Sequence, residues 1–384
     1  MARRRRLGAL AAVALVAVLV GVAVGARGGS HDLAGPPYDA SRDPAGRPPS
    51  ALAQARAEVA RMPLERQVGQ TLIVAFAGTR APGYVLAALR EGRVAGTILF
   101  GGNAPDAASV RALTASLRRA GPTAIVCLDQ EGGAIRTLRF APAAAGQAAQ
   151  PTPAAAGAAA AATAKALRRA GVNVVLGPVA DVAAGTPGSA MASRVFPGDA
   201  AAVAASVRAA TRAYLAAGVL PVPKHFPGLG GATVNTDHGD ARVERTRAQL
   251  TADLAPFRAA FAAGAPLTML GHARYPALDP RAIASQSRAV ATDLLRGTLG
   301  FDGVAMTDSL EAQAALSEAG GDVGAAAVRS MRAGADLLLT TGPGSFPLVR
   351  DALARAARRS PAFHARLLDA AARVLALRRT RLDD

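Results

Sequence analysis

Residues 219–231 read VLPVPKHFPGLGG, and this stretch decides how the fold is interpreted. Val219–Val222 is a short apolar run of the kind that forms a buried strand, and Lys224 and His225 follow it directly. The glycines after them let the backbone approach a ligand closely. Only two of the 44 Lys and Arg residues in the chain are lysines. We therefore interpret Lys224 as a functional residue, with a solvated turn as the structural alternative.

The same alternation of a short apolar run and a segment of helical period continues on both sides of this stretch. Eight strands are predicted, at Thr71–Phe76, Gly96–Phe100, Ala124–Leu128, Asn173–Leu176, Val219–Val222, Leu267–Leu270, Val304–Met306 and Asp336–Thr340. Helices are predicted at Ala104–Arg119, Pro153–Ala170, Ala200–Ala217, Arg247–Ala263 and Leu310–Ala333, with further helical segments from Phe346 to Arg379. Eight strand–helix units predict an α/β fold, a TIM-like (β/α)8 barrel.

The positions of chemically capable side chains favour the barrel. Asp129 follows the third predicted strand, His272 the sixth and Asp308 the seventh. Barrel enzymes build their active sites at the carboxyl ends of the strands, so this placement predicts an enzyme. A doubly wound open sheet is the alternative. It usually has a Gly-rich phosphate turn after its first strand, whereas residues 77–80 here read Ala-Gly-Thr-Arg.

The N-terminal part of the chain is predicted to lie outside this domain. Four arginines, Arg3–Arg6, precede the apolar run Leu7–Ala26, which has about the length that crosses a bilayer as a helix. We expect residues 1–26 to be a signal peptide or signal anchor, residues 27–50 to be a flexible Pro/Gly-rich linker, and residues 51–384 to be a single catalytic domain. The protein is then extracytoplasmic, either secreted or anchored to the cytoplasmic membrane by its N-terminal helix alone.

Composition excludes several classes of protein. The 384 residues are 51% hydrophobic and 18% charged, which supports a sizeable core and excludes a wholly disordered chain. One cysteine, Cys127, excludes an intramolecular disulfide and a cysteine-rich metal site. The net charge of +17 includes the four N-terminal arginines, and the other basic residues are spread along predicted helices without clustered aromatics. No nucleic-acid partner is therefore expected.

Two further motifs carry candidate catalytic groups. Residues 235–240, Asn-Thr-Asp-His-Gly-Asp, place the carboxylate of Asp237 beside the imidazole of His238. This pair suits general acid–base chemistry near neutral pH, and a polar turn is the structural alternative. Asp308 is open to three interpretations, as a covalent nucleophile, a metal ligand or the N-cap of the helix from Leu310. No metal-ligand spacing of histidines accompanies it, so no metal is expected.

Asp129 begins a third motif, Asp-Gln-Glu-Gly-Gly at residues 129–133. Its two carboxylates suit the recognition of paired sugar hydroxyls, and a strained turn is the alternative reading of the glycines.

Taken together, these motifs resemble glycoside hydrolase family 3, in its single-domain bacterial β-N-acetylglucosaminidase (β-N-acetylhexosaminidase) branch. The resemblance runs from about Leu64 to Leu377. It is carried by Gly96–Phe100, Asp129–Gly133, Gly177–Val182, Ser193–Phe196, Lys224–Gly228 and Gly300–Asp308. It implies a retaining glycosidase without a cofactor, in which a carboxylate attacks the anomeric carbon of a carbohydrate substrate and an acid protonates the leaving oxygen.

The resemblance also implies roles for single residues. Asp308 matches the family's nucleophile. The residues that match its sugar-binding positions are Asp129, Arg194, Lys224 and His225. A second sugar-binding arginine of the family falls on Thr137 here, so the neighbouring Arg136 is the candidate for its role. We also expect His272 to bind substrate.

The chain departs from the family at the acid/base. The family branch has an Asp-Ser-His dyad whose positions are Asn235, Thr236 and Asp237 here, with His238 displaced by one, and Leu229 replaces a further histidine. Three interpretations stay open. Asp237 acts as the acid/base with His238 in support, His238 reaches the site through a shift of the loop, or the protein binds sugar with little turnover.

These observations predict an exported retaining glycosidase that cleaves terminal β-linked N-acetylglucosamine or a related β-hexoside, from peptidoglycan fragments, through a covalent intermediate on Asp308. A weak or inactive glycan or muropeptide receptor is the first alternative. An aldolase that forms a Schiff base on Lys224 is the second. The chain has no Trp and only four Tyr, so a small pocket for one terminal sugar is expected in place of an extended cleft.

Overall fold

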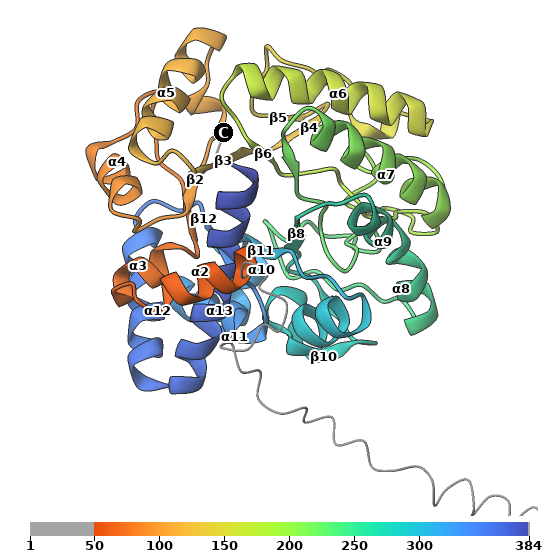
Figure 1. Cartoon of the computed structure of the whole chain (residues 1–384). Helices are drawn as coiled ribbons and strands as arrows, with labels where there is room; N and C mark the ends of the chain where they lie inside the picture. The colour runs from red at the N-terminus through yellow and green to blue at the C-terminus, as the bar shows by residue number, and fades with distance from the viewer. Residues whose placement is uncertain (1–49, 383–384) are drawn as a thin grey trace, which may run out of the picture. The chain divides into compact units, whose positions relative to one another are not determined.

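The computed structural model describes residues 50–382 (Figure 1). The predicted signal segment, 1–26, and the predicted linker, 27–50, lie outside the described residues except for Ser50, which caps the first described helix, α2 (Ala51–Val59). Eight parallel strands form the centre of the fold, one for each strand predicted from the sequence. They are β1 (Leu72–Val74), β2 (Gly96–Ile98), β3 (Ile125–Leu128), β6 (Val174–Val175), β7 (Leu220–Pro221), β8 (Leu267–Leu270), β11 (Val304–Ser309) and β12 (Leu337–Thr340).

The strands form a nearly closed barrel. Their order in the sheet is β7-β6-β3-β2-β1-β12-β11-β8, so successive barrel strands are paired except β7 and β8, which form the two ends, and β12 pairs with β1. Two backbone hydrogen bonds connect the two ends of this sheet: Met269 N donates to Pro223 O at 3.0 Å, and Phe226 N donates to Met269 O at 2.7 Å. The open-sheet alternative is therefore wrong.

Helices cover the outside of the barrel (Figure 1). They are α4 (Gly83–Arg90), α5 (Ala107–Ala120), α6 (Pro153–Arg169), α7 (Ala200–Ala216), α8 (Arg247–Asp253), α9 (Ala255–Ala262), α10 (Gln313–Glu318), α11 (Val323–Ala333) and α12 (Ser345–Arg359), with α3 (Leu64–Gly69) ahead of β1 and a π-helix at Ala289–Thr298. Asp106 and Asp199 cap the N-termini of α5 and α7. Such caps satisfy the free N–H groups of a first turn.

Two predicted helices are each divided in two. The segment 247–263 breaks at Leu254, because Pro256, in the first turn of α9, has no N–H to donate. The segment 310–333 breaks at Gly320 and Gly321, which both have positive φ angles that favour glycine. Its first helix begins only at Gln313, since β11 continues to Ser309. The prediction of a helix from Leu310 was therefore wrong at its start.

The last helix, α13 (Pro361–Arg381), covers the amino-terminal end of the barrel. Its residues Val374 and Leu377 pack against the apolar interior of the barrel, which includes Ile73, Ile125, Cys127, Leu267 and Met306. Arg373 donates to Asp302 O, and Arg378 donates to Thr123 O, just ahead of β11 and β3. The other end of the barrel is left free for the loops that follow the strands.

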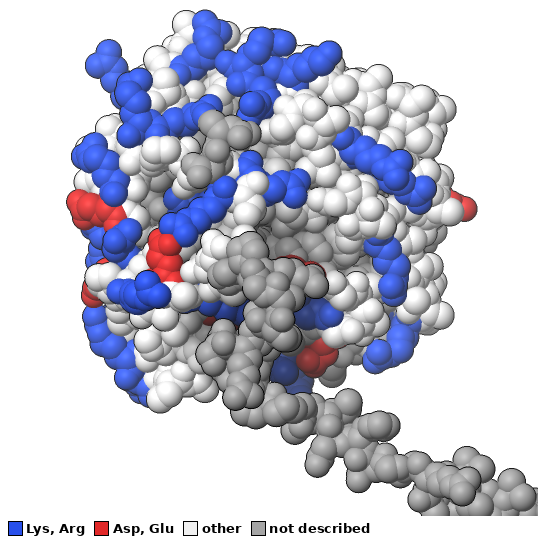
Figure 2. All heavy atoms as spheres, viewed as in Figure 1, with Lys and Arg blue, Asp and Glu red and all other residues white. Residues whose placement is uncertain are grey.

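Figures 1 and 2 view the domain from the end covered by α13, where α2 crosses in front of it. Figure 2 shows basic side chains spread around this face with few acidic ones between them. Helices α5, α6 and α12 end in paired arginines, which interact favourably with the negative end of the helix dipole. Within residues 50–382, no helix is long and apolar enough to span a bilayer.

Candidate active site

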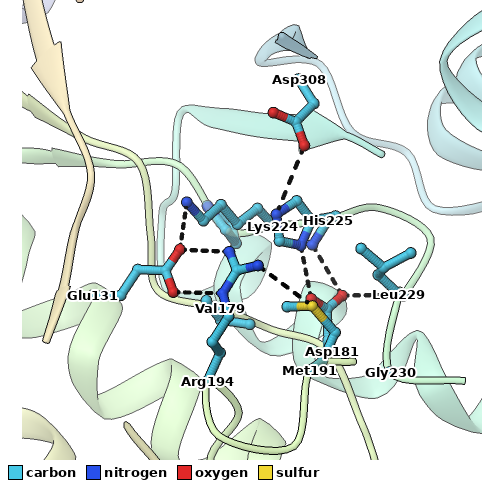
Figure 3. Close-up of polar contacts among 12 residues, drawn as sticks. Glu131, Val179, Asp181, Met191, Arg194, Lys224, His225, Leu229, Gly230 and Asp308 are labelled. Carbon is cyan, nitrogen blue, oxygen red and sulfur yellow. Dashed lines mark hydrogen bonds and ion pairs between the residues drawn. The ribbon is translucent and has the colours of Figure 1, made fainter. Parts of the chain in front are cut away.

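The carboxyl ends of β3, β7 and β11 bring four of the predicted site residues together. Asp129 follows the last residue of β3, Lys224 and His225 follow β7, and Asp308 is the penultimate residue of β11. In a parallel barrel these strand ends meet at one face. Figure 3 shows Lys224, His225 and Asp308 lying close together there.

Lys224 lies at the centre of a buried ionic cluster. Its Nζ is 2.5 Å from Asp129 Oδ1 and 2.7 Å from Glu131 Oε1. Arg194 binds Glu131 in a bidentate manner, with Nη2 at 2.7 Å from Oε1 and Nε at 2.9 Å from Oε2 (Figure 3). Such a fork fixes the guanidinium in one plane. The cluster therefore presents Asp129, Lys224 and Arg194 in fixed positions beside Asp308.

Charge pairing controls the protonation states in this cluster. Burial alone would raise the pKa of Glu131, but Lys224 and Arg194 together lower it to about 2. Burial would lower the pKa of Lys224, but the charges of Asp129 and Glu131 hold it above its usual value. Lys224 is therefore a permanent cation. A Schiff-base lysine needs the opposite shift, so this geometry does not support the aldolase interpretation.

His225 connects the nucleophile candidate to a fully buried carboxylate. Its Nδ1 is 2.8 Å from Asp181 Oδ2, and its Nε2 is 3.8 Å from Asp308 Oδ2. The other oxygen of Asp181 accepts hydrogen bonds from the backbone N–H groups of His225 and Leu229. Asp181 thus fixes both the imidazole ring and the start of the loop that carries it (Figure 3).

Asp308 has the environment of an ionised nucleophile. Its Oδ1 accepts a hydrogen bond from Ser309 N at 2.8 Å. Burial would raise its pKa, but electrostatic interactions with His225, His272 and Lys224, together with this hydrogen bond, hold the pKa below its usual value. Its side chain caps no helix, because β11 extends past it to Ser309. The N-cap interpretation of Asp308 is therefore wrong.

His272 lies behind this nucleophile candidate. The residue is fully buried, with Nδ1 at 2.7 Å from Ser285 Oγ and Nε2 at 2.8 Å from the carbonyl oxygen of Ser309. Both ring nitrogens are thus occupied by protein groups. The structure places His272 where it holds the backbone next to Asp308, and it shows no free ring nitrogen for a sugar hydroxyl.

The two acid/base candidates lie in an exposed loop. Asp237 and His238 are both exposed, and their described hydrogen bonds come from the backbone: Asp237 N donates to Asn235 Oδ1, and His238 N donates to Asn235 O. The loop is connected to the start of α10, because Gln313 N donates to Asp237 O and Ala314 N to Thr236 O. The loop therefore lies close to the strand end that carries Asp308, while its two candidate side chains are exposed.

Arg136 is not brought into the ionic cluster. It lies in β5 (Ile135–Arg136), which pairs with β4 (Gln130–Gly132) so that Arg136 is opposite Gln130. The side chain of Gln130 contacts Leu138 and Pro142, away from the cluster, and paired residues in adjacent strands share a face. Arg136 Nε is buried without a hydrogen-bond partner.

Asp181 is a residue of the site to which the motif reasoning gave no role, and Glu131 was considered only as the second carboxylate of the motif at residues 129–133. Both are carboxylates in the quoted family stretches, and each lies a few residues after a predicted strand. That position is the same signal that selected Asp129 and Asp308. Within residues 50–382, the structure contains no group of three His, Cys, Asp or Glu side chains arranged to hold a metal ion.

Comparison with known proteins agrees with this geometry. The family described as "Glycosyl hydrolase family 3 N terminal domain" matches this chain over residues 63–377. A protein named beta-hexosaminidase from Xanthomonas oryzae pv. oryzae (strain KACC10331 / KXO85) is 34% identical over 284 residues, which cover 71% of this chain and 84% of that protein.

Two solved structures are similar as well. A glycoside hydrolase family 3 β-N-acetylglucosaminidase from Paenibacillus sp. str. FPU-7 matches with a TM-score of 0.79 and 32% identity, covering 84% of this chain and 64% of that protein. A β-N-acetylhexosaminidase from Beutenbergia cavernae DSM 12333 matches with a TM-score of 0.72 and 33% identity, covering 83% of this chain and 99% of that protein. The match over residues 63–377, together with the carboxylates, the lysine and the arginine at the strand ends, shows that the chain belongs to glycoside hydrolase family 3 and is a glycosidase.

Proposed function

We propose that the chain is an exported, retaining β-N-acetylhexosaminidase that releases terminal β-linked N-acetylglucosamine from peptidoglycan fragments. The observation that carries the reaction type is the environment of Asp308, an ionised carboxylate whose Oδ1 is fixed by Ser309 N–H and whose Oδ2 faces His225. The substrate class is supported by the relatives named β-hexosaminidase and β-N-acetylglucosaminidase. Export is supported by the sequence of residues 1–26.

The proposed reaction has two steps. In the first, Oδ2 of Asp308 attacks the anomeric carbon of the terminal sugar, the bond from that carbon to the leaving oxygen breaks, and an acid gives a proton to the leaving oxygen. In the second, the deprotonated acid takes a proton from a water molecule whose oxygen attacks the same carbon, and the bond to Asp308 breaks to release it as a carboxylate. The hydroxyl groups of the sugar bind Asp129, Lys224 and Arg194, which the ionic cluster holds in place.

His225 has a supporting part in this scheme. Its Nε2 is near enough to the Asp308 carboxylate to stabilise its charge and to contact a sugar hydroxyl next to the reacting carbon. Asp237 is the acid in this proposal, with His238 beside it, because the loop that carries them is joined to the start of α10 close to Asp308.

Trapping of the covalent intermediate tests the reaction type. A 5-fluoro N-acetylglucosaminyl fluoride should add one sugar mass to the purified protein, and digestion should place the sugar on the peptide that contains Asp308. The Asp308→Asn variant should show no adduct and should lose at least roughly 10³-fold in hydrolysis of an aryl N-acetylglucosaminide. An adduct of the same yield in this variant would overturn the role of Asp308.

The second candidate function is a glycan or muropeptide receptor with little turnover. The exposure of Asp237 and His238 and the absence of the family's Asp-Ser-His dyad favour it. An aryl N-acetylglucosaminide distinguishes the two, because its leaving group needs little help from an acid. Hydrolysis of this compound supports the enzyme, whereas binding of N-acetylglucosamine without any aryl release supports the receptor.

The location is tested separately. The full chain should be found outside the cytoplasm after cell fractionation, and N-terminal sequencing of the product should show whether residues 1–26 are removed. Recovery of the whole chain in the cytoplasm would overturn export without affecting the reaction.

A further inference from the structure

A cavity lies at the end of the barrel that carries the sugar-binding residues, but none of those residues lines it. It has a volume of about 830 Å³ and is formed by the segments that follow β1, β2 and β12. Four aromatic side chains line it, from Phe76, Tyr84, Phe100 and Phe346. Ligand pockets usually have volumes of roughly 300–1,000 Å³ and predominantly apolar walls, so this cavity has the size and lining of a binding site.

Exposed apolar groups collect around this cavity. Tyr84 is 57% exposed and Phe100 is 40% exposed, although both are large aromatic residues. Exposed apolar side chains gathered at one place indicate contact with a partner or ligand.

The walls of the cavity are fixed in place. Asn103 is buried, and its Nδ2 donates to Phe76 O at 2.9 Å and to Gly78 O at 2.7 Å, while its Oδ1 accepts from Phe100 N at 2.7 Å. One side chain thus connects the segments after β1 and β2. A cavity that exists before the ligand arrives loses less entropy on binding than one that must be ordered.

The third wall is connected to the nucleophile. Thr341 lines the cavity, and its Oγ1 is 2.6 Å from the Oγ of Ser309, the residue directly after Asp308. The carboxylate of Glu311 holds this contact, because its Oε2 accepts hydrogen bonds from Ser309 Oγ, Thr341 Oγ1 and Thr341 N. This wall of the cavity is therefore joined by hydrogen bonds to the strand end that carries Asp308.

The barrel topology explains why the rest of a substrate would lie there. The sugar-binding residues follow β3, β6, β7 and β11, so they occupy one side of the carboxyl-terminal face. The segments after β12, β1 and β2 form the opposite side, and they are the ones that line the aromatic cavity. When the terminal ring of a sugar chain is bound at Asp308, the rest of the chain must extend toward the side that the sugar-binding residues do not occupy.

From this arrangement we propose that the cavity is the subsite for the leaving group and binds the next sugar rings of an oligosaccharide. The C–H face of a pyranose ring is apolar and stacks on the electron-rich face of an aromatic ring, which Tyr84 and Phe100 can offer. The inference rests on the proposed glycosidase function and deepens it. It also replaces the expectation of a small pocket for one sugar with a site for several rings. Phe and Tyr side chains supply the aromatic surfaces that Trp would otherwise offer.

The experiment compares two substrates that differ only in their leaving group. N-acetylglucosaminyl fluoride has a single atom as its leaving group, whereas chitotriose has a disaccharide. The Phe100→Ala and Tyr84→Ala variants should each lower kcat/KM for chitotriose by roughly three- to tenfold and leave kcat/KM for the fluoride unchanged. The control is Phe140→Ala, because Phe140 is 46% exposed but lies in the segment after β5, outside the cavity. It should change neither value.

Equal losses for both substrates, or no loss for chitotriose, would overturn the subsite. Failure of the proposed function gives a different result, in which the unaltered protein hydrolyses neither compound. In that case calorimetry with chitotriose decides the subsite, because Phe100→Ala must weaken binding relative to Phe140→Ala. Equal affinities in these two variants would overturn it.

Discussion

Nε2 of His225 lies 3.8 Å from Oδ2 of Asp308. The opposite nitrogen of the same ring is 2.8 Å from Asp181, a carboxylate with no exposed surface. The position of the imidazole beside the proposed nucleophile is therefore set by a fully buried residue, which does not reach the sugar itself. Asp181 acts on the reaction through His225, which makes it a positioning residue.

The Asp181→Asn variant tests this role. Asn keeps an oxygen for the backbone N–H groups of His225 and Leu229, but it removes the charged acceptor of the ring. We expect kcat/KM for an aryl N-acetylglucosaminide to fall on the order of a hundredfold, with a changed pH profile. The thermal unfolding midpoint serves as the control for folding. An unchanged pH profile in a folded variant would contradict the positioning role.

The acid/base is identified by leaving-group dependence. Loss of a general acid slows release of a poor leaving group far more than release of an aryl group. We expect Asp237→Ala to lower kcat by roughly 10²-fold or more for a disaccharide and by less than roughly tenfold for an aryl substrate. His238→Ala is the matched variant in the same loop. A larger substrate difference in His238→Ala would transfer the role to His238, and no difference in either would remove it from this loop.

Glu131 should make stability depend on pH in acid. Its pKa is about 2 in the folded protein, below the ordinary value of a glutamate in an unfolded chain, about 4.3. The ionised form therefore stabilises the fold above the unfolded pKa, and this contribution is lost as the pH falls toward 2. The difference in unfolding free energy between the unaltered protein and Glu131→Gln should shrink by about 2 kcal/mol between pH 5 and pH 3.

Urea unfolding at several pH values measures this difference. Glu244→Gln is the control, because the side chain of Glu244 is 68% exposed and pairs only with the exposed Arg242 in the described contacts. It should show no comparable change with pH. A Glu131→Gln difference that stays constant from pH 5 to pH 3 would contradict the depressed pKa of Glu131.

Gly96 has no room for a side chain. A Cβ at this position would lie 2.0 Å from the carbonyl oxygen of Ile125, its partner in the β2–β3 pairing. Gly96→Ala should therefore lower the unfolding free energy by roughly 2–4 kcal/mol in urea titrations. At Gly102 a Cβ would meet nothing within 4 Å, so Gly102→Ala should change it by less than about 0.5 kcal/mol. Similar values for the two variants would show that the strand pair tolerates the shift.

The barrel could be predicted because its strands are short apolar runs with functional residues after them. The lengths of the individual strands could not be predicted in the same way. The predicted strand Val219–Val222 is reduced to Leu220–Pro221, since prolines 221 and 223 have no N–H for a ladder. The barrel is instead completed beyond them, through Pro223 O and Phe226 N.

The site was predictable only where one residue acts alone. Asp308 and Lys224 stand out by position and by rarity, and the structure brings them together. The part played by Asp181 depends on an imidazole 44 residues further along the chain, a contact that no local pattern contains. Arg136 was selected as the neighbour of Thr137, the position where the family's arginine falls, but the β4–β5 register places it opposite Gln130.

The first and last helices of the domain have a common interface. Ala55 and Val59 of α2 pack against Ala371, Ala372 and Leu375 of α13, and α13 also covers the barrel interior. During synthesis, α2 is therefore made well before α13, the helix against which it packs. A nascent or truncated polypeptide without residues 361–382 leaves the apolar interior of its barrel open to water and to proteases. Folding of this domain therefore needs residues 361–382, which follow all of its strands along the chain.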